Sequence, residues 1–271
     1  MTYTLVFIGG GNMASAILGG LLKKGHHQPA QVCVVEPFEA QRAALTQQFG
    51  VHALAAADAS LAGAQTVVWA VKPQSFAEAA APCRPFVPQA LQLSVMAGIR
   101  SEALARATGS ERIVRAMPNT PALIGQGISG LCARPAVTAA EREQVQALLA
   151  PTGATLWVDQ EADLDAVTAL SGSGPAYVFF FLEAMVDAAQ RMGLSAEQGT
   201  QLALATFGGA TAMAQRSTEP MARLRERVTS KGGTTQAALD RMAAGAVQEQ
   251  IVAAVLAARD RARELGAEFG A

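Results

Sequence analysis

The sequence predicts an α/β N-terminal domain, residues 1–160, followed by an all-α C-terminal domain, residues 161–271. Up to about Val158, short β-branched runs alternate with segments of helical periodicity, which is typical of a parallel sheet with helices on both faces. Near-continuous apolar runs such as Thr66–Val71 indicate strands that are buried on both sides. Beyond Val158 the strand-like runs stop and long helical patterns take their place.

The elements expected in the α/β part follow from these runs in order. The strands are expected at Leu5–Ile8, Val32–Val35, Thr66–Val71, Leu91–Val95 and Arg112–Ala116. The clearest helical patterns between them cover Ala14–Lys24, Glu39–Phe49 and Ser101–Ala107.

The all-α part contains four long helical patterns, at 161–170, 176–194, 196–216 and 246–265. The segment "YVFFFLEAMV" is apolar on more than one face, and a helix that is apolar all round is normally buried. Because a domain of this size has a small interior, we expect burial against a second subunit and an obligate homodimer. A monomeric helical bundle is the alternative.

Composition restricts the possible partners and compartment. The chain has 271 residues, is 51% hydrophobic and 16% charged, and has a net charge of −1, so it forms a sizeable core and has no expected nucleic-acid partner. The three cysteines, Cys33, Cys83 and Cys132, are odd in number and widely spaced, which argues against disulfides or a metal site and favours the reducing cytoplasm. No signal peptide and no membrane span are expected, because glycines and charges interrupt the apolar runs.

A glycine-rich turn follows the first expected strand. The segment from Gly9 to Ala14 matches G-x-G-x-x-A between a strand and a helix, which is the context of a Rossmann-like dinucleotide-binding turn. Gly9 allows the tight turn, Gly11 lets the backbone approach a pyrophosphate, and Ala14 lets the helix pack closely on the strand. The helix N-terminus then offers free amide hydrogens to the phosphates. The alternative is a glycine-rich turn that binds nothing.

Glu36 ends the next expected strand, where such domains contact the adenosine ribose. A carboxylate there accepts hydrogen bonds from the ribose hydroxyls and repels a 2′-phosphate, so the position favours NADH over NADPH. Arg42, in the following helix, offers a positive charge that would compensate in favour of NADPH. A solvent-exposed glutamate without a ligand is the other reading.

Five further segments, taken together with the glycine turn, carry a family resemblance. They are "AVKPQ" (70–74), "MAGI" (96–99), "RAMPNTPALIGQG" (115–127), "ALSGSGPAY" (169–177) and "TSKGGTTQAAL" (229–239). In this order and over essentially the whole chain, the sequence resembles bacterial pyrroline-5-carboxylate reductase. The resemblance implies NAD(P)H-dependent reduction of 1-pyrroline-5-carboxylate to L-proline, the last step of proline biosynthesis. It also implies a homodimer, with a pentamer of dimers as a larger assembly.

The resemblance also implies which residues hold the cofactor. These are Ile8, Gly9, Gly10, Gly11, Asn12, Met13, Ala14, Glu36, Ala70, Val71, Lys72, Pro73, Ala97 and Asn119. Ala70 to Pro73 and Ala97 follow strands at their carboxyl ends, where open α/β sheets bind ligands. A solvated loop lysine is the alternative for Lys72, and formation of a Pro-flanked turn is the alternative for Asn119.

Substrate binding is expected in the helical part. "KGGTT" interrupts the helical pattern, and Thr234 and Thr235 then open a new helix where hydroxyls and free amides converge on an anion such as a carboxylate. The resemblance implies that Thr235 is the catalytic residue, with its hydroxyl hydrogen-bonded near the substrate ring nitrogen. It also implies that the partner subunit supplies this loop, which includes the substrate-binding Gly233. Simple N-capping by one of the two threonines is the alternative for that pair. Ser173 is a further expected substrate contact, with packing of the neighbouring glycines against another helix as the alternative. Lys231 departs from the usual family pattern, which has proline there.

The reaction type is consistent with these residues. A protonated imine is already electrophilic, so reducing it requires positioning rather than the strong acid that a ketone needs. The histidines, His26, His27 and His52, all lie away from the expected substrate segments. A β-hydroxyacid dehydrogenase is the enzyme alternative, but "SGSGPAYVFFFLEAM" lacks the Lys and Asn expected on its long helix. A non-catalytic dinucleotide sensor is the alternative from another class.

Overall fold

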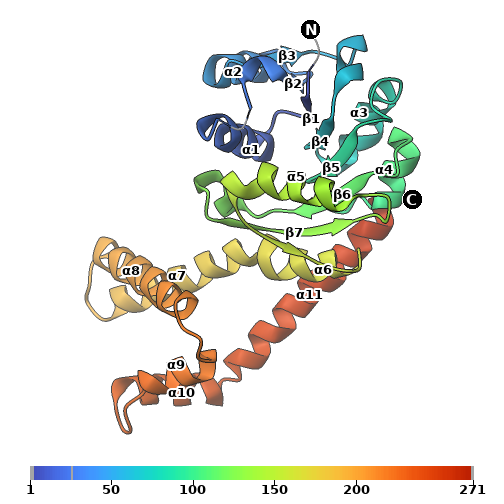
Figure 1. The fold of residues 1–271 in the computed structure, drawn as a ribbon. Coiled ribbons are helices and arrows are strands. Elements are labelled where there is room, and N and C mark those ends of the chain that lie inside the picture. Colours follow the sequence, from blue (N-terminus) through green and yellow to red (C-terminus); the bar gives the residue numbers. More distant parts are fainter. Residues whose placement is uncertain (1–2, 26, 270–271) are drawn as a thin grey trace. The chain divides into compact units, whose positions relative to one another are not determined.

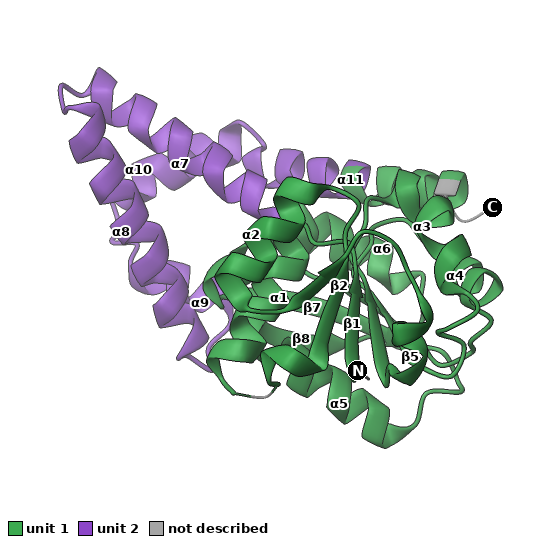
Figure 2. Ribbon diagram, turned by 90° about the horizontal axis from the view of Figure 1, so that it is seen from above, with its two compact units in different colours: residues 1–173, 258–271 green, residues 174–257 purple. Residues whose placement is uncertain are grey.

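The structure is a computed structural model and describes residues 3–25 and 27–269 (Figure 1). Its contacts divide the chain into two compact units. Unit 1 comprises Met1–Ser173 with Ala258–Ala271, and unit 2 comprises Gly174–Ala257 (Figure 2).

Unit 1 is built on one eight-stranded sheet in the order β3-β2-β1-β4-β5-β6-β7-β8. The strands are β1 (Leu5–Ile8), β2 (Val32–Val35), β3 (His52–Leu54), β4 (Thr66–Trp69), β5 (Leu91–Ser94), β6 (Ile113–Met117), β7 (Gly127–Ala133) and β8 (Gly153–Trp157). The first six strands are mutually parallel, and β1 lies between β2 and β4. This order reverses direction at β1, which creates a crevice at the carboxyl ends of β1 and β4.

Helices cover both faces of this sheet, as the alternating pattern predicted. They are α1 (Asn12–Lys23), α2 (Glu39–Phe49), α3 (Phe76–Cys83), α4 (Ser101–Thr108) and α5 (Ala139–Leu149). Successive residues of a strand point to opposite faces. In β1, Leu5 and Phe7 therefore join one buried cluster with α1, α2 and α5, whereas Val6 and Ile8 join a second cluster with α3 and α4.

The sheet differs from the expectation in β7 and β8. β7 runs antiparallel to β6, and β8 is parallel to β7, so the expected all-parallel sheet is wrong for these two strands. Only a short connection with the 3₁₀ turn η4 (Thr120–Ile124) separates β6 from β7, and a parallel crossover needs a longer one. β3, β7 and β8 were not expected from the sequence. β7 ("GISGLCA") has few β-branched residues, and β8 is an edge strand with alternately exposed residues.

The segment after β8 packs on the sheet rather than with the helical unit. It contains α6 (Asp163–Val167) and a π-helical turn (Thr168–Gly172). A Cβ added to Gly130 would lie 2.6 Å from Cγ1 of Val167, so glycine in β7 allows the close approach of α6. The contact-based division therefore falls at Ser173, and the boundary at 160/161 stays a prediction.

A buried ion pair links this segment to the sheet. Nη1 of Arg115 in β6, whose side chain is 6% exposed, donates a 2.8 Å hydrogen bond to Oε1 of Glu161. The amide and hydroxyl of Ser101, at the start of α4, donate to the same carboxylate at 2.7 and 2.6 Å. Burial raises the pKa of Glu161, but the Ser101 hydrogen bonds and the Arg115 charge outweigh it and hold that pKa below its usual value.

Replacing Glu161 with glutamine is expected to lower the free energy of unfolding by about 3 kcal/mol at neutral pH, because Arg115 then keeps a buried charge without its partner. Since the folded-state pKa of Glu161 is depressed, its contribution is present above the ordinary carboxyl pKa of 4.5 and is lost as the pH falls further. Urea unfolding of both proteins at neutral pH and at about pH 3 measures the difference, which shrinks on acidification.

The matched control is Glu102→Gln, which removes the exposed pair with Arg106 and is expected to change stability by under about 0.5 kcal/mol. Two results would contradict a stabilising buried pair. One is an equal loss of unfolding free energy in Glu161→Gln and Glu102→Gln, and the other is a loss in Glu161→Gln that persists at about pH 3.

Unit 2 is helical. It contains α7 (Gly174–Arg191), α8 (Ala196–Gln215), α9 (Met221–Arg227), α10 (Thr234–Ala244) and most of α11 (Val247–Phe269). α7 and α8 form a hairpin in which Ser195 and Gln198 make a capping box at the start of α8. In the described structure only Ala189 of α7 and Gly199 and Ala203 of α8 are buried. The unit therefore has almost no core of its own within one chain.

The helix α7 belongs to a stretch that is apolar enough to resemble a membrane span. The helical stretch Asp163–Arg191 is long and apolar enough to cross a membrane by length and composition alone, and 6% of its most apolar window is buried. A helix that packs against another subunit passes the same test. The expected absence of a membrane span therefore stays a prediction.

Candidate functional site

The glycine turn after β1 is shaped by its neighbours. Gly9 has φ +94°, a backbone conformation that favours glycine, and an added Cβ would lie 2.8 Å from the Ala70 carbonyl oxygen. An added Cβ on Gly10 would lie 2.5 Å from Cδ1 of Leu45 in α2. These two glycines are thus required by packing between β1, the loop after β4, and α2.

Gly11 differs from the other two glycines. It is exposed, it is the N-cap of α1, and an added Cβ would meet no heavy atom of the described residues within 4 Å. Among those residues no side chain caps α1, so the amides of its first turn stay available to a ligand. A small residue is therefore not required here by the described residues, and the first-turn amides are open to an anion.

Glu36 lies at the end of β2 and is 7% exposed, so the reading of a solvent-exposed glutamate is wrong. Its Oε2 accepts a 3.0 Å hydrogen bond from the Gly10 amide, and its Oε1 accepts one from the Phe38 amide at 3.0 Å. Two backbone amides thus fix a carboxylate beside the glycine turn. Arg42 donates through Nη1 to the main-chain oxygens of Glu36 and Pro37 at 2.9 and 2.7 Å.

The remaining expected cofactor residues follow strands at the same edge of the sheet. Ala70 to Pro73 follow β4, Ala97 follows β5, and Asn119 follows β6. Lys72 and Ala97 are exposed, and the Val71 side chain would contact a Cβ on Gly9. Ile8 and Ala14 are buried in the core, whereas Asn12 is exposed and Met13 is half-buried. The parallel strands therefore bring these expected cofactor residues to one edge of the sheet.

Ser173 closes the π-turn that follows α6. Its amide donates to the Thr168 carbonyl at 2.8 Å, five residues back, as a π-turn requires. Asn119 reaches this turn, because its Nδ2 donates to the Ser171 carbonyl at 3.2 Å. The structure thus connects two segments, "RAMPNTPA" and "SGSGPAY", that lie far apart in the sequence.

Thr234, Thr235 and Gly233 belong to unit 2. Gly233 is the N-cap of α10, after Gly232 with φ +72°, and the threonines are the first two helical residues. Among the described residues no side chain caps this helix, so neither threonine has the N-cap role that was the alternative reading. Thr234 is exposed and Thr235 is half-buried, next to amides of the first turn that have no helical partner.

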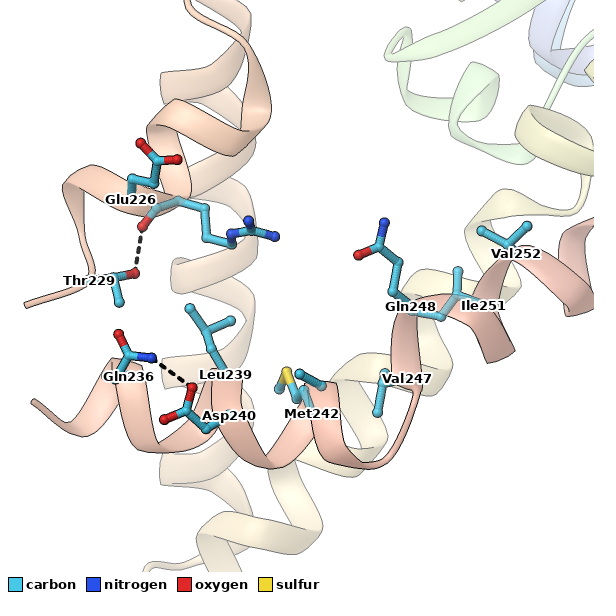
Figure 3. Close-up of a pocket in the computed structure, with 12 residues that line it drawn as sticks. Glu226, Thr229, Gln236, Leu239, Asp240, Met242, Val247, Gln248, Ile251 and Val252 are labelled. Carbon is cyan, nitrogen blue, oxygen red and sulfur yellow. Dashed lines mark hydrogen bonds between the residues drawn. The ribbon is translucent and has the colours of Figure 1, made fainter. Parts of the chain in front are cut away.

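A cavity of about 660 Å³ lies on the flank of α10 (Figure 3). Its apolar lining comes from α10 and α11 and consists of Leu239, Met242, Ala243, Val247, Ile251 and Val252. Thr234 and Thr235 do not line it. The other lining residues are polar or charged and are Arg225, Glu226, Thr229, Gln236, Asp240 and Gln248, so the cavity has a mixed lining, and its α10 part begins one residue after Thr235.

The histidines and acidic residues form no cluster of metal ligands in the part of the chain that the structure describes. Within the described ranges, no group of three or more His, Cys, Asp or Glu side chains is placed to hold a metal ion. His52 lies in β3, where its ring stands 5.6 Å from the ring of Tyr3. His26 lies outside the described residues.

Some contacts of the site were not anticipated from the sequence. The Gln41 side chain donates to the Gly10 carbonyl at 2.6 Å, and Asn119 bonds to the π-turn. The second contact has a sequence signal, since Pro175 stands four residues after Ser171 and cannot donate a helical hydrogen bond. The first has no comparable signal.

The chain is similar to known proteins over its full length. Residues 161–265 match the family "pyrroline-5-carboxylate reductase dimerisation", and residues 4–98 match "NADP oxidoreductase coenzyme F420-dependent". Pyrroline-5-carboxylate reductase of Pseudomonas aeruginosa is 42% identical over 271 residues, 99% of each chain. The pyrroline-5-carboxylate reductase structure from Coxiella burnetii matches with TM-score 0.90 and 34% identity, covering 98% of this chain and 99% of that one. The Plasmodium falciparum pyrroline carboxylate reductase structure with NADP bound has TM-score 0.86 and 28% identity, covering 97% and 98%.

Proposed function

This chain belongs to the pyrroline-5-carboxylate reductase family, and we propose how its own residues carry out that reaction. It is an NAD(P)H-dependent oxidoreductase that reduces 1-pyrroline-5-carboxylate to L-proline, the last step of proline biosynthesis. The observation that carries this conclusion is the match over 99% of both chains to a reductase of this name. Relatives that are 42%, 39% and 35% identical over nearly the whole chain are each named pyrroline-5-carboxylate reductase, which favours this activity over a β-hydroxyacid dehydrogenase or a dinucleotide sensor.

In our proposal the cofactor lies along the carboxyl edge of the sheet. The Gly11 backbone and the first-turn amides of α1 hold the pyrophosphate, and Glu36 meets the adenosine ribose. The loops that contain Ala70 to Pro73, Ala97 and Asn119 border the nicotinamide half. Bound there, the reduced nicotinamide supplies a hydride.

The substrate is held by Gly233, Thr234 and Thr235, with Ser173 as a further contact. The first-turn amides of α10 suit its carboxylate, and the half-buried Thr235 hydroxyl hydrogen-bonds near the ring nitrogen. The nitrogen carries its proton before reduction and keeps it afterwards, so these residues orient the imine and need not transfer a proton. We propose that the partner subunit supplies this loop.

We propose that NADH is the preferred cofactor. The Glu36 carboxylate is fixed by the Gly10 and Phe38 amides, and the Nη1 of Arg42 is engaged by main-chain oxygens. The 2′-phosphate of NADPH would therefore lie next to the fixed Glu36 carboxylate. Repulsion between these two negative charges would weaken the binding of NADPH. The NADP-bound Plasmodium relative shows that a cofactor with the phosphate is bound within the family.

The preference is tested by comparing kcat/KM for the two cofactors. The unmodified chain is expected to favour NADH, and Glu36→Ser is expected to raise the NADPH to NADH ratio by about tenfold. Arg42→Gln is the matched control for the positive charge and should leave a preference for NADH. A strong preference of the unmodified chain for NADPH would contradict the role of Glu36.

We propose that the chain forms a homodimer, and that five dimers assemble further. The dimerisation family covers residues 161–265, and unit 2 leaves large apolar side chains in water, including Phe180 at 69% and Leu202 at 56% exposure. One chain does not bury these groups, so a second copy that covers them gains hydrophobic free energy.

The three buried free cysteines support a cytoplasmic location.

Light scattering measures the mass in solution, which is expected to be at least twice the 28.0 kDa of one chain. Phe180→Lys is expected to lower that mass or cause aggregation, because it places a charge in the apolar contact. Phe38→Lys is the control, because Phe38 is 74% exposed in unit 1 and lies outside the dimerisation family's residues. A stable monomer of the unmodified chain would contradict the proposal.

A further inference from the structure

The main-chain carbonyl of Ser171 lacks its ordinary helical partner. In an α-helix this oxygen accepts a hydrogen bond from the amide four residues later. That residue is Pro175, which has no amide hydrogen. The carbonyl lies in the π-turn Thr168–Gly172, between α6 and α7, so another donor has to satisfy it.

Asn119 supplies that donor from the loop after β6. Its Nδ2 donates to the Ser171 oxygen at 3.2 Å, while its Oδ1 accepts a 3.0 Å hydrogen bond from the Ile128 amide in β7. One half-buried side chain thus ties together the loop after β6, the start of β7, and the π-turn. Both ends of the amide are used, which neither a hydroxyl nor a carboxylate of similar size reproduces.

The π-turn is also pressed against the end of β6. A Cβ on Gly172 would lie 2.8 Å from Cε of Met117, the last residue of that strand. The Ser171 hydroxyl donates back to the Val167 carbonyl at 3.0 Å, and the Ser173 amide donates to the Thr168 carbonyl at 2.8 Å. Ser173 lies in the same turn as Ser171, two residues further along the chain. The hydrogen bond from Asn119 to Ser171 therefore also fixes the position of Ser173.

From this arrangement we infer that Asn119 is a positioning residue of the reductase. It replaces the amide hydrogen that Pro175 lacks, and it thereby holds the π-turn and Ser173 in place against the loop that borders the nicotinamide. The inference rests on the proposed function for its kinetic consequence. The hydrogen bond from Asn119 to the Ser171 carbonyl, in place of one from residue 175, does not depend on that function.

A double-mutant cycle tests it in the full-length protein, with Asn119→Ala, Pro175→Ala and the double variant. Asn119→Ala is expected to lower kcat for pyrroline-5-carboxylate by about tenfold, a larger change than in the NAD(P)H Kd, because the turn that carries Ser173 moves and the pyrophosphate site does not. Pro175→Ala restores an amide hydrogen for the Ser171 carbonyl. The double variant is therefore expected to recover to within about threefold of the unmodified kcat.

Two further variants refine the result. Asn119→Asp keeps the acceptor for the Ile128 amide but loses the donor, so it should be as impaired as Asn119→Ala. Gln47→Ala changes an exposed residue of α2, outside the loop after β6, and should leave kcat unchanged. A double variant as impaired as the product of the two single effects, or unchanged kcat in Asn119→Ala, would overturn the inference.

Hydrogen exchange separates this inference from the proposed function. The Ser173 amide is expected to exchange faster in Asn119→Ala and to regain protection in the double variant, with no substrate present. If the unmodified chain does not reduce pyrroline-5-carboxylate but exchange follows this pattern, the proposed function fails and the coupling stands. If exchange does not respond to Asn119, the coupling itself is wrong.

Discussion

Replacing Thr235 with alanine is expected to lower kcat/KM for pyrroline-5-carboxylate well over tenfold and to leave the NAD(P)H Kd nearly unchanged. Thr235 is the second residue of α10, it is half-buried, and its hydroxyl lies beside first-turn amides without helical partners. In the proposed site this hydroxyl bonds near the ring nitrogen of the substrate. Its removal therefore affects the substrate side of the reaction and not the glycine turn of unit 1.

Steady-state kinetics and cofactor titration of the same preparation measure both quantities. Thr235→Ser keeps the hydroxyl and should recover most of the activity. Thr200→Ala is the matched control, because that exposed threonine donates only to the Ala196 carbonyl within α8 in the described structure. Activity of Thr235→Ala at the unmodified level would show that the substrate pocket has been placed wrongly.

Replacing Gly11 with alanine is expected to weaken NAD(P)H binding by more than about tenfold, with little effect on folding. An added Cβ meets no described atom within 4 Å, so the substitution changes stability by under about 1 kcal/mol. In the proposed site, the same Cβ would stand where the pyrophosphate approaches the backbone. Fluorescence titration of NAD(P)H and thermal unfolding measure the two effects separately.

Gly9→Ala gives the opposite pattern and serves as the comparison. With φ +94° and a Cβ 2.8 Å from the Ala70 carbonyl oxygen, alanine is expected to lower stability by about 1–3 kcal/mol. Cofactor affinity that is unchanged in Gly11→Ala would show that the pyrophosphate does not lie at this turn. A large loss of stability in Gly11→Ala would show that the glycine is required by packing instead.

The sequence predicted the parts of the site that depend on local pattern. The glycine turn follows β1 and opens α1, and Glu36 directly follows β2, because a G-x-G-x-x-A segment and a β-branched run are both local features. The strands β1 and β2 begin and end where their apolar runs do. The sequence assigned Gly9 to the tight turn and Gly11 to a pyrophosphate, but it did not predict that a Cβ on Gly9 would clash with Ala70, since that contact depends on a neighbouring strand.

The sequence did not predict contacts between residues that are far apart in the chain, because a local pattern does not specify which distant residue it contacts. β7 runs antiparallel because the connection after β6 is short, and its glycine-containing sequence did not indicate a strand. The Asn119 bond to Ser171 joins residues 52 positions apart. The reaction itself came from the resemblance carried by "RAMPNTPA", "SGSGPAY" and "KGGTT", because no local physical rule links these segments to an imine.

The central claim is that this chain reduces a cyclic imine with a reduced nicotinamide. The most direct measurement is oxidation of NADH and NADPH by the purified full-length protein with 1-pyrroline-5-carboxylate, followed by identification of the product. We predict substrate-dependent oxidation that forms one equivalent of L-proline per NAD(P)H consumed, faster with NADH. Tight cofactor binding without turnover, or oxidation that forms no proline, would contradict the account.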